Sequence, residues 1–289
     1  MEKDDVLRKI YSKIDEIPTL PAVVPKLLSV MESETSNASD IADTISNDPA
    51  LSSKILKVAN SAYYGFSQEI LSLKLAMTLL GHNMVKSLAL SIGVIHSLPS
   101  GRRSPNFSDK GLWIHSLAVA TLMQELGKRF RKGGNPEQFF IIGLLHDIGK
   151  VVLNLYFSEL FQEALEEVHN EGIAGLHIAE SRLIGFDHGE IGAMLLTRWK
   201  FPDVISSSIA LHHQKEAPEG INGRDVAMLR VANALPQELD LGQDGNPVPP
   251  AISRQDLKVL EIGENEIEEM RAYLIGVKDE IYALIDAMT

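Results

Sequence analysis

Histidine is concentrated in the middle third of this chain, in a pattern that can support metal chemistry. Seven of the nine histidines lie between positions 115 and 213, and the apolar stretch FFIIGLLHD ends in His146 followed directly by Asp147. Neutral imidazole is the commonest protein ligand for metals near pH 7, and a neighbouring carboxylate adds a hard oxygen donor. Mixed nitrogen and oxygen ligands suit Fe, Zn, Mn, Co or Ni. The predicted ligands are His115, His146, Asp147, His188, His212 and His213.

These ligands are expected on four helical segments that face a shared interior. His115 lies among apolar residues in LWIHSLAVATLMQEL, and His188 follows Asp187, which has the chemistry of a helix N-cap. Helical bundles build metal sites in this way, from side chains on facing helices. A single buried histidine is more often a hydrogen-bonded core residue, so the prediction depends on the combination. The other histidines are assigned to that structural class: His82, His96, His169 and His177.

Two further residues follow His146-Asp147 in the string HDIGK. Gly149 indicates either the end of a helix or a close approach to a ligand. Lys150 can hold a substrate phosphate as a point charge, although a solvated lysine explains the sequence equally well. If the site is catalytic, Asp147 and Lys150 are therefore the candidate catalytic residues.

The composition limits the class of protein. The 289 residues are 45% hydrophobic and 23% charged, which is typical of a globular chain, and they contain no cysteine. Any metal must therefore be held by His, Asp, Glu, Asn or water. The net charge of −12 disfavours general nucleic-acid binding, because phosphate recognition needs a basic face. The charged N-terminus lacks a signal-peptide core and no apolar run approaches about 18 residues, so we expect a cytoplasmic protein without membrane association.

The pattern of apolar residues predicts an all-α protein. Helical spacing runs through almost every segment, Asp48-Pro49 has the chemistry of a helix start, and no stretch shows the sustained alternation of a strand. Breaks rich in Pro, Ser, Gly and polar residues occur at 98–109 and 240–251. We therefore predict a two-lobed helical bundle, with an N-terminal lobe at 1–100, a metal-binding lobe at 101–240, and a linker and C-terminal helix at 241–289.

Several motifs resemble known families. HDIGK with an upstream histidine resembles the HD superfamily of metal-dependent phosphohydrolases, and the wider histidine pattern resembles its HD-GYP branch, which hydrolyses cyclic di-GMP. The N-terminal half is more specific, because IPTLPAVVPKLLSVM and NDPALSSKILKVANSA resemble the HDOD domain, the HD-related output domain of bacterial signalling proteins. The resemblance covers about residues 18–240. It implies an HDOD lobe followed by an HD-like lobe, and a regulatory role.

The sequence departs from the HD and HD-GYP patterns at three places. Asn233 in LRVANAL stands where the HD pattern has a metal-ligating Asp, and Gly111 stands where the dinuclear branch often has a Glu. No Gly-Tyr-Pro signature follows His213. The first two differences remove negative charge that would hold a metal and activate its bound water. We therefore expect negligible hydrolysis of cyclic di-GMP.

Three functions agree with these observations. The leading one is a bacterial signal-transduction output module that acts through protein contacts and binds a metal in its second lobe. The alternative is a metal-dependent phosphohydrolase (phosphodiesterase) acting on a phosphoester or nucleotide, and the third is a di-iron redox or O2 sensor. The expected cofactor is one or two divalent ions, with Fe first and Mn, Zn, Ni or Co as alternatives. The expected partners are a signalling protein, a phosphoester or nucleotide ligand, and a second copy of the chain in a homodimer.

Overall fold

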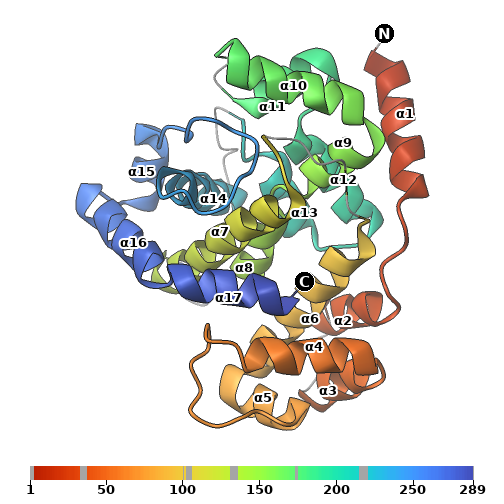
Figure 1. The fold of residues 1–289 in the computed structure, drawn as a ribbon, viewed down its shortest axis with the longest axis vertical. Helices are drawn as coiled ribbons and strands as arrows, with labels where there is room; N and C mark the ends of the chain where they lie inside the picture. The colour runs from red at the N-terminus through yellow and green to blue at the C-terminus, as the bar shows by residue number, and fades with distance from the viewer. Residues whose placement is uncertain are drawn as a thin grey trace. The chain divides into compact units, whose positions relative to one another are not determined.

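The computed structural model describes residues 3–32, 38–99, 101, 106–130, 136–172, 175–214 and 221–288. Within these residues the regular secondary structure is α-helical and no strand forms, which confirms the predicted all-α class (Figure 1). The helices are α1 (Lys3–Glu16), α2 (Val23–Glu32), α3 (Ala38–Ser46), α4 (Pro49–Ala59), α5 (Leu73–Leu80), α6 (His82–Ser97), α7 (Asp109–Phe130), α8 (Pro136–Leu145), α9 (Ile148–Tyr156), α10 (Ser158–Asn170), α11 (Leu176–Leu183), α12 (His188–Arg198), α13 (Asp203–Ala210), α14 (Ile221–Glu238), α15 (Arg254–Leu260), α16 (Glu264–Gly276) and α17 (Lys278–Met288).

The chain folds into two compact units. Unit 1 contains Met1–Ile17 and Pro99–Gly276, and unit 2 contains Pro18–Leu98 and Val277–Thr289. Unit 1 therefore holds α1 and α7 to α16, whereas unit 2 holds α2 to α6 and α17. The division into three domains that the sequence suggests remains a prediction about which segments fold independently.

Local signals set several helix ends. In unit 2, α4 begins at Pro49, and the carboxylate of the N-cap Asp48 accepts a hydrogen bond from the Leu51 N–H (3.0 Å). This cap was predicted from the sequence. The segment 253–288 differs from prediction, because it forms three helices in place of one. Its first break is at Glu261, which adopts a left-handed backbone conformation (φ 58°) directly after α15.

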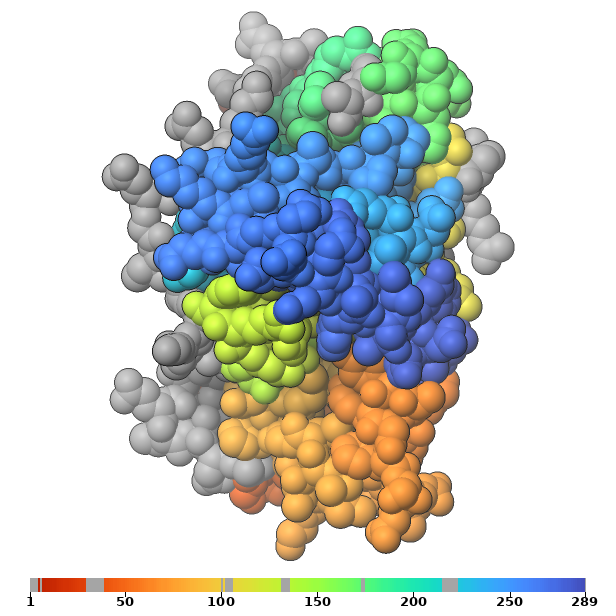
Figure 2. Space-filling model, turned by 90° about the vertical axis from the view of Figure 1, so that its left-hand side faces the viewer, coloured from red at the N-terminus to blue at the C-terminus, as the bar shows by residue number. Residues whose placement is uncertain are grey.

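The core of unit 1 is built around α7. This helix is buried on all sides from Gly111 to Gln124, and it packs against α8, α14 and α16 (Figure 1). A helix that is apolar all round belongs in the interior of a fold. By contrast, α16 is amphipathic: it buries Ile267, Met270 and Leu274, and its outer face forms part of the surface drawn in blue in Figure 2.

The stretch Pro136–Tyr156 is long and apolar enough to cross a membrane, by length and composition. It comprises α8 and α9, and 89% of its most apolar window is buried inside the fold. The helices α5 and α6 pass the same test only as a pair bent by 116°. The burial of Pro136–Tyr156 is typical of core helices in a globular fold.

α8 ends at Leu145 and α9 begins at Ile148, close to the predicted end of the apolar helix at His146-Asp147. Each packs closely on a different neighbour. A Cβ at Gly143 in α8 would lie 2.5 Å from the Ala120 Cα of α7, and a Cβ at Gly149 in α9 would lie 1.9 Å from the His188 carbonyl oxygen of α12. These two close approaches hold α8 against α7 and α9 against α12. Gly149 therefore serves a backbone contact with α12, and it lies in the first turn of α9 and not at a helix end.

Replacing Gly149 by Ala is expected to lower the free energy of unfolding by about 1–3 kcal/mol, because the added methyl group overpacks the contact between α9 and α12. Denaturant unfolding followed by circular dichroism measures this change. Gly276→Ala is the matched control, since a Cβ at Gly276 meets no atom within 4 Å. An unchanged unfolding midpoint for Gly149→Ala would contradict the close approach of the two helices.

Candidate metal centre

The structure brings all six predicted ligands together inside unit 1. Their candidate ligand atoms form two clusters, and within each cluster these atoms lie within 4.8 Å of one another. His213 is half-buried and the other five side chains are buried. That these residues bind a metal ion remains a prediction. The first cluster is His115, His146 and Asp147, and the second cluster is His188, His212 and His213.

Helix ends position most of these ligands. His188 is the first residue of α12, and Asp187 caps this helix by accepting a hydrogen bond from the Glu190 N–H (2.9 Å), as predicted. One adjacent pair of ligands forms the break between α8 and α9, and the other follows the end of α13. The four segments contribute His115 (α7), His146-Asp147 (between α8 and α9), His188 (α12) and His212-His213 (after α13).

Two histidines are oriented by the helix that precedes them. The Nδ1–H of His146 donates to the Gly143 carbonyl (2.7 Å), and the Nδ1–H of His212 donates to the Ile209 carbonyl (2.6 Å). Both acceptors lie in the last turn of a helix, where carbonyls lack intrahelical partners. A carbonyl can only accept, so the proton is on Nδ1 and the Nε2 lone pair of each ring is available to a metal.

His188 is oriented by a buried carboxylate. Its Nδ1–H donates to Glu180 Oε2 (2.6 Å), and the same oxygen accepts the His188 backbone N–H (2.8 Å). A carboxylate behind a ligating histidine fixes the ring and raises its basicity, and such partners are typical of metal sites. Burial alone would lower the pKa of His188, but Glu180 and Asp147 raise it to about 9. A metal ion at Nε2 must therefore displace a proton from this ring.

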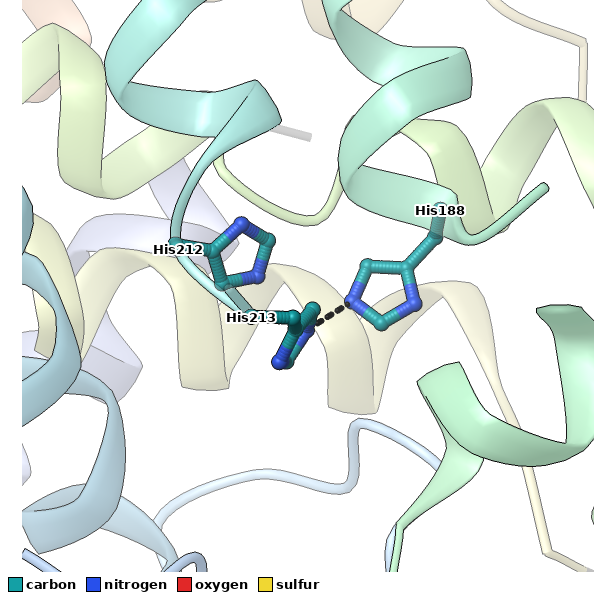
Figure 3. A group of neighbouring side chains, drawn as sticks. All are labelled: His188, His212 and His213. Atoms are coloured by element: carbon teal, nitrogen blue, oxygen red, sulfur yellow. Dashed lines mark hydrogen bonds between the residues drawn. The ribbon is translucent and has the colours of Figure 1, made fainter. Parts of the chain in front are cut away.

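In the second cluster the imidazole nitrogens converge. His213 Nε2 lies 2.8 Å from His188 Nε2, and the rings of His212 and His213 have centroids 3.8 Å apart (Figure 3). His212 Nε2 is buried and has no hydrogen-bond partner among the residues that the structure describes. Burial and the neighbouring imidazoles lower the pKa of His212 and His213 well below the usual value, so both rings are neutral. The protonated His188 can donate from Nε2 to His213 Nε2, and a divalent ion could take the place of that proton among these nitrogen donors.

In the first cluster the imidazoles face Asn233. Its Oδ1 lies 2.8 Å from His115 Nε2 and 3.2 Å from His146 Nε2. Burial lowers the pKa of His115 to about 4, so this ring is neutral as well. The amide oxygen occupies the position expected for the aspartate of the HD pattern. It can ligate a metal, but it adds no negative charge.

Asp147 connects the two clusters. Its Oδ1 lies 3.1 Å from His188 Nε2, and its Oδ2 lies 3.3 Å from His146 Nε2. Burial alone would raise the pKa of this completely buried carboxylate, but the neighbouring His146, Lys150 and His188 lower it well below the usual value. One ionised carboxylate thus offers an oxygen to each cluster.

Lys150 is buried between two carboxylates. Its ammonium donates to Asp147 Oδ2 and to Asp244 Oδ2, both at 2.8 Å. Burial opposes the charge, but the two carboxylates raise the pKa of Lys150, so it is a cation. The interpretation of Lys150 as a solvated lysine is therefore wrong. Its role toward a substrate phosphate remains a prediction.

A cavity of about 260 Å³ adjoins the second cluster. His177, from α11, lines this cavity, and its ring stacks on that of His213 with centroids 4.1 Å apart and 2° between the planes. The assignment of His177 to the structural histidines remains a prediction, and the residue contacts the predicted ligand His213. The lining residues are His177, His212, His213, Gln214, Arg230, Asn233, Pro250, Ala251, Ser253 and Asp256.

Two carboxylates of this centre, Glu180 and Asp244, were not predicted from the sequence. The sequence contains a signal for Glu180, because this residue shares the apolar face of α11 with Leu176 and Ala179. A carboxylate buried on such a face needs a partner. Asp244 had no local signal. It lies in the polar break at 240–251, and its partner Lys150 is 94 residues away in the chain.

Glu180→Gln is expected to weaken metal binding by about 10- to 100-fold, because the amide no longer places negative charge behind His188. Isothermal titration with Zn²⁺ measures the dissociation constant. Glu163→Gln, at an exposed position of α10, is the matched control. Equal affinity in the wild type and Glu180→Gln would exclude Glu180 from the metal centre.

Comparison with known proteins agrees with this architecture. The sequence profile of the HDOD domain matches residues 17–215. A curated relative, an uncharacterized protein of Treponema pallidum (strain Nichols), is 30% identical over 211 residues, which are 73% of this chain and 40% of that protein. The chain therefore spans less than half the length of this relative.

Solved structures share the fold along the whole chain. The HDOD domain protein of Geobacter sulfurreducens is 27% identical, with a TM-score of 0.81 over 99% of this chain and 97% of that chain. A "putative phosphohydrolase" of Shewanella amazonensis SB2B is 25% identical, with a TM-score of 0.76 over 97% and 98%. A "putative signal transduction protein" of Marinobacter aquaeolei VT8 has the same fold at 20% identity, with a TM-score of 0.83 over 99% and 66%. With its all-helical fold and a profile match over most of its length, this chain belongs to the HDOD domain family, a relative of the HD superfamily of metal-dependent phosphohydrolases.

Proposed function

We propose that this HDOD protein is a signal-transduction output module whose unit 1 binds a divalent metal ion, and that it acts through contacts with a signalling protein. One observation carries the metal site. The rings of His146, His188 and His212 are each held through Nδ1, so that their Nε2 atoms face the interior of the two clusters. Side chains that are oriented in this way before binding need little rearrangement to accept an ion.

The donor set defines the chemistry of the proposed ion. It contains imidazole nitrogens, one carboxylate and one amide oxygen, and the chain has no cysteine to add sulfur. Such ligands suit Fe, Mn, Co, Ni and Zn, and Fe is our first choice. A bound ion would polarise water or a phosphoester oxygen as a Lewis acid, or it would serve as a structural or sensory group.

Two features favour regulation over turnover. Asn233 brings a neutral oxygen to the position where hydrolases of the HD pattern have a charged ligand. Lys150 is held by Asp147 and Asp244, so its ammonium is not free to orient a phosphate without breaking two buried ion pairs. Breaking a buried pair typically costs about 3–5 kcal/mol.

The second candidate function is a metal-dependent phosphohydrolase acting on a phosphoester or nucleotide. The observation that favours it is the cavity of about 260 Å³ beside the second cluster, which gives a small ligand access to the predicted ligands His212 and His213. The Shewanella relative named as a phosphohydrolase, at 25% identity, adds support. In this case the predicted ligands would hold an ion that supplies Lewis-acid chemistry to the substrate phosphate.

Metal content tests the leading proposal. Protein purified without an affinity tag or chelating resin should contain one or two divalent ions per chain by mass spectrometry. His146→Ala should abolish this metal content and lower the melting temperature, because an ion bound only to the folded state stabilises it. His82→Ala, in unit 2, is the control and should leave both values unchanged. Wild-type protein that takes up no Fe²⁺, Mn²⁺, Co²⁺, Ni²⁺ or Zn²⁺ would refute the metal site.

Hydrolysis assays separate the two functions. We expect negligible turnover of cyclic di-GMP by the wild type with Mn²⁺ or Fe²⁺, because of the neutral Asn233 and the missing Gly-Tyr-Pro signature. Turnover on the order of 1 s⁻¹, as in ordinary enzymes, would overturn the regulatory proposal. Asn233→Asp restores the charge of the HD pattern and should raise metal affinity. If it also raises hydrolysis, the centre has lost an activity that its geometry still permits.

A further inference from the structure

The loop at residues 241–246 follows the C-terminal end of α14 and reaches the candidate metal centre. Gly242 has a φ of 84°, and a Cβ on it would lie 2.4 Å from both the Gly111 carbonyl oxygen and the His115 backbone nitrogen. The Gln243 N–H donates to the same Gly111 carbonyl (3.0 Å). Glycine is therefore required where the loop lies against α7. This contact fixes the loop directly beside the first cluster.

The loop delivers the carboxylate of Asp244 into the interior. Its Oδ2 accepts hydrogen bonds from Lys150 Nζ (2.8 Å) and Asn246 Nδ2 (2.5 Å), and its Oδ1 accepts one from the Asn246 N–H (3.1 Å). Only 2% of Asp244 is exposed. The Lys150 ammonium lowers the pKa of Asp244 against the effect of burial, so the group is ionised. Asp244 is thus a buried anion, and the Lys150 ammonium lies between its carboxylate and that of Asp147.

The charges in the described part of this centre can be counted. Asp147, Glu180 and Asp244 are negative and Lys150 is positive, so their sum is −2 when the histidines are neutral. Arg230, which binds the His212 carbonyl, adds no net charge because it pairs with Asp256 (3.1 Å). One divalent cation would therefore make the buried centre neutral. Without Asp244 the same centre would hold a net positive charge, which is costly in a low-dielectric interior.

We infer that Asp244 supplies the negative charge that Asn233 lacks, and that it acts on the metal through Lys150 as a positioning residue. Lys150 alone would neutralise Asp147, the one carboxylate among the predicted ligands. By sharing the ammonium, Asp244 leaves the charge of Asp147 available to an ion. This inference rests on the proposed metal site and explains how a centre with Asn233 can still attract a divalent cation.

Co²⁺ affinity in charge-matched variants tests the inference, with dissociation constants taken from visible absorption titrations at constant pH. Asp244→Asn should weaken Co²⁺ binding by about 10- to 100-fold, the usual effect of losing a partner of a metal ligand. Two double variants return the charge sum to −2 and should restore wild-type affinity: Asn233→Asp with Asp244→Asn, and Lys150→Met with Asp244→Asn. Lys150→Met alone should bind Co²⁺ more tightly than the wild type.

Asp48→Asn is the matched control, because it makes the same substitution at a helix N-cap in unit 2, where Asn caps as well as Asp. Unchanged affinity in Asp244→Asn, or a double variant that remains as weak as Asp244→Asn, overturns the inference. If Asp244→Asn does not fold, the Lys150→Met variant tests the inference in its place. Weaker Co²⁺ binding by Lys150→Met than by the wild type would contradict charge compensation. A wild type that binds no Co²⁺ refutes the proposed metal site itself, which is a different result.

Discussion

The buried carboxylate of Asp147 is the group around which unit 1 is organised. A charge without solvent is tolerated only when it is paired and hydrogen-bonded. Lys150 Nζ lies 2.8 Å from it, and the Nε2 atoms of His188 and His146 lie at 3.1 and 3.3 Å. Lys150 in turn needs a second carboxylate, which Asp244 provides. Satisfying one buried charge therefore brings α9, α12 and the loop at 241–246 to the same point.

One local arrangement occurs twice in this centre. His146 and His212 each follow the end of a helix and donate from Nδ1 to the carbonyl three residues earlier. The helix end supplies a carbonyl that would otherwise lack a partner, and the histidine gains a fixed tautomer and orientation. The close contact between Gly149 and the His188 carbonyl then brings α12 within reach of the first cluster. Backbone packing thus sets the separation of the two clusters.

These features support the proposed regulatory role over turnover of a substrate. Its carboxylates are already bound to Lys150 or to a histidine, and the cavity lies beside only the second cluster. Under the proposed function, metal binding would stabilise unit 1, because ligands that bind only the folded state stabilise it.

The sequence by itself determined the features that depend on neighbours along the chain. Apolar spacing predicted the all-α class, Asp48 and Asp187 predicted helix starts, and the histidine pattern predicted the six candidate ligands. The tertiary structure decided what depends on distant segments: the contact of His115 with Asn233 spans 118 residues, and that of Lys150 with Asp244 spans 94. Helical periodicity and capping are local, so they could not reveal that Lys150 is buried or that a polar loop supplies its second carboxylate. Only the packing of helices against one another brings those charges into contact.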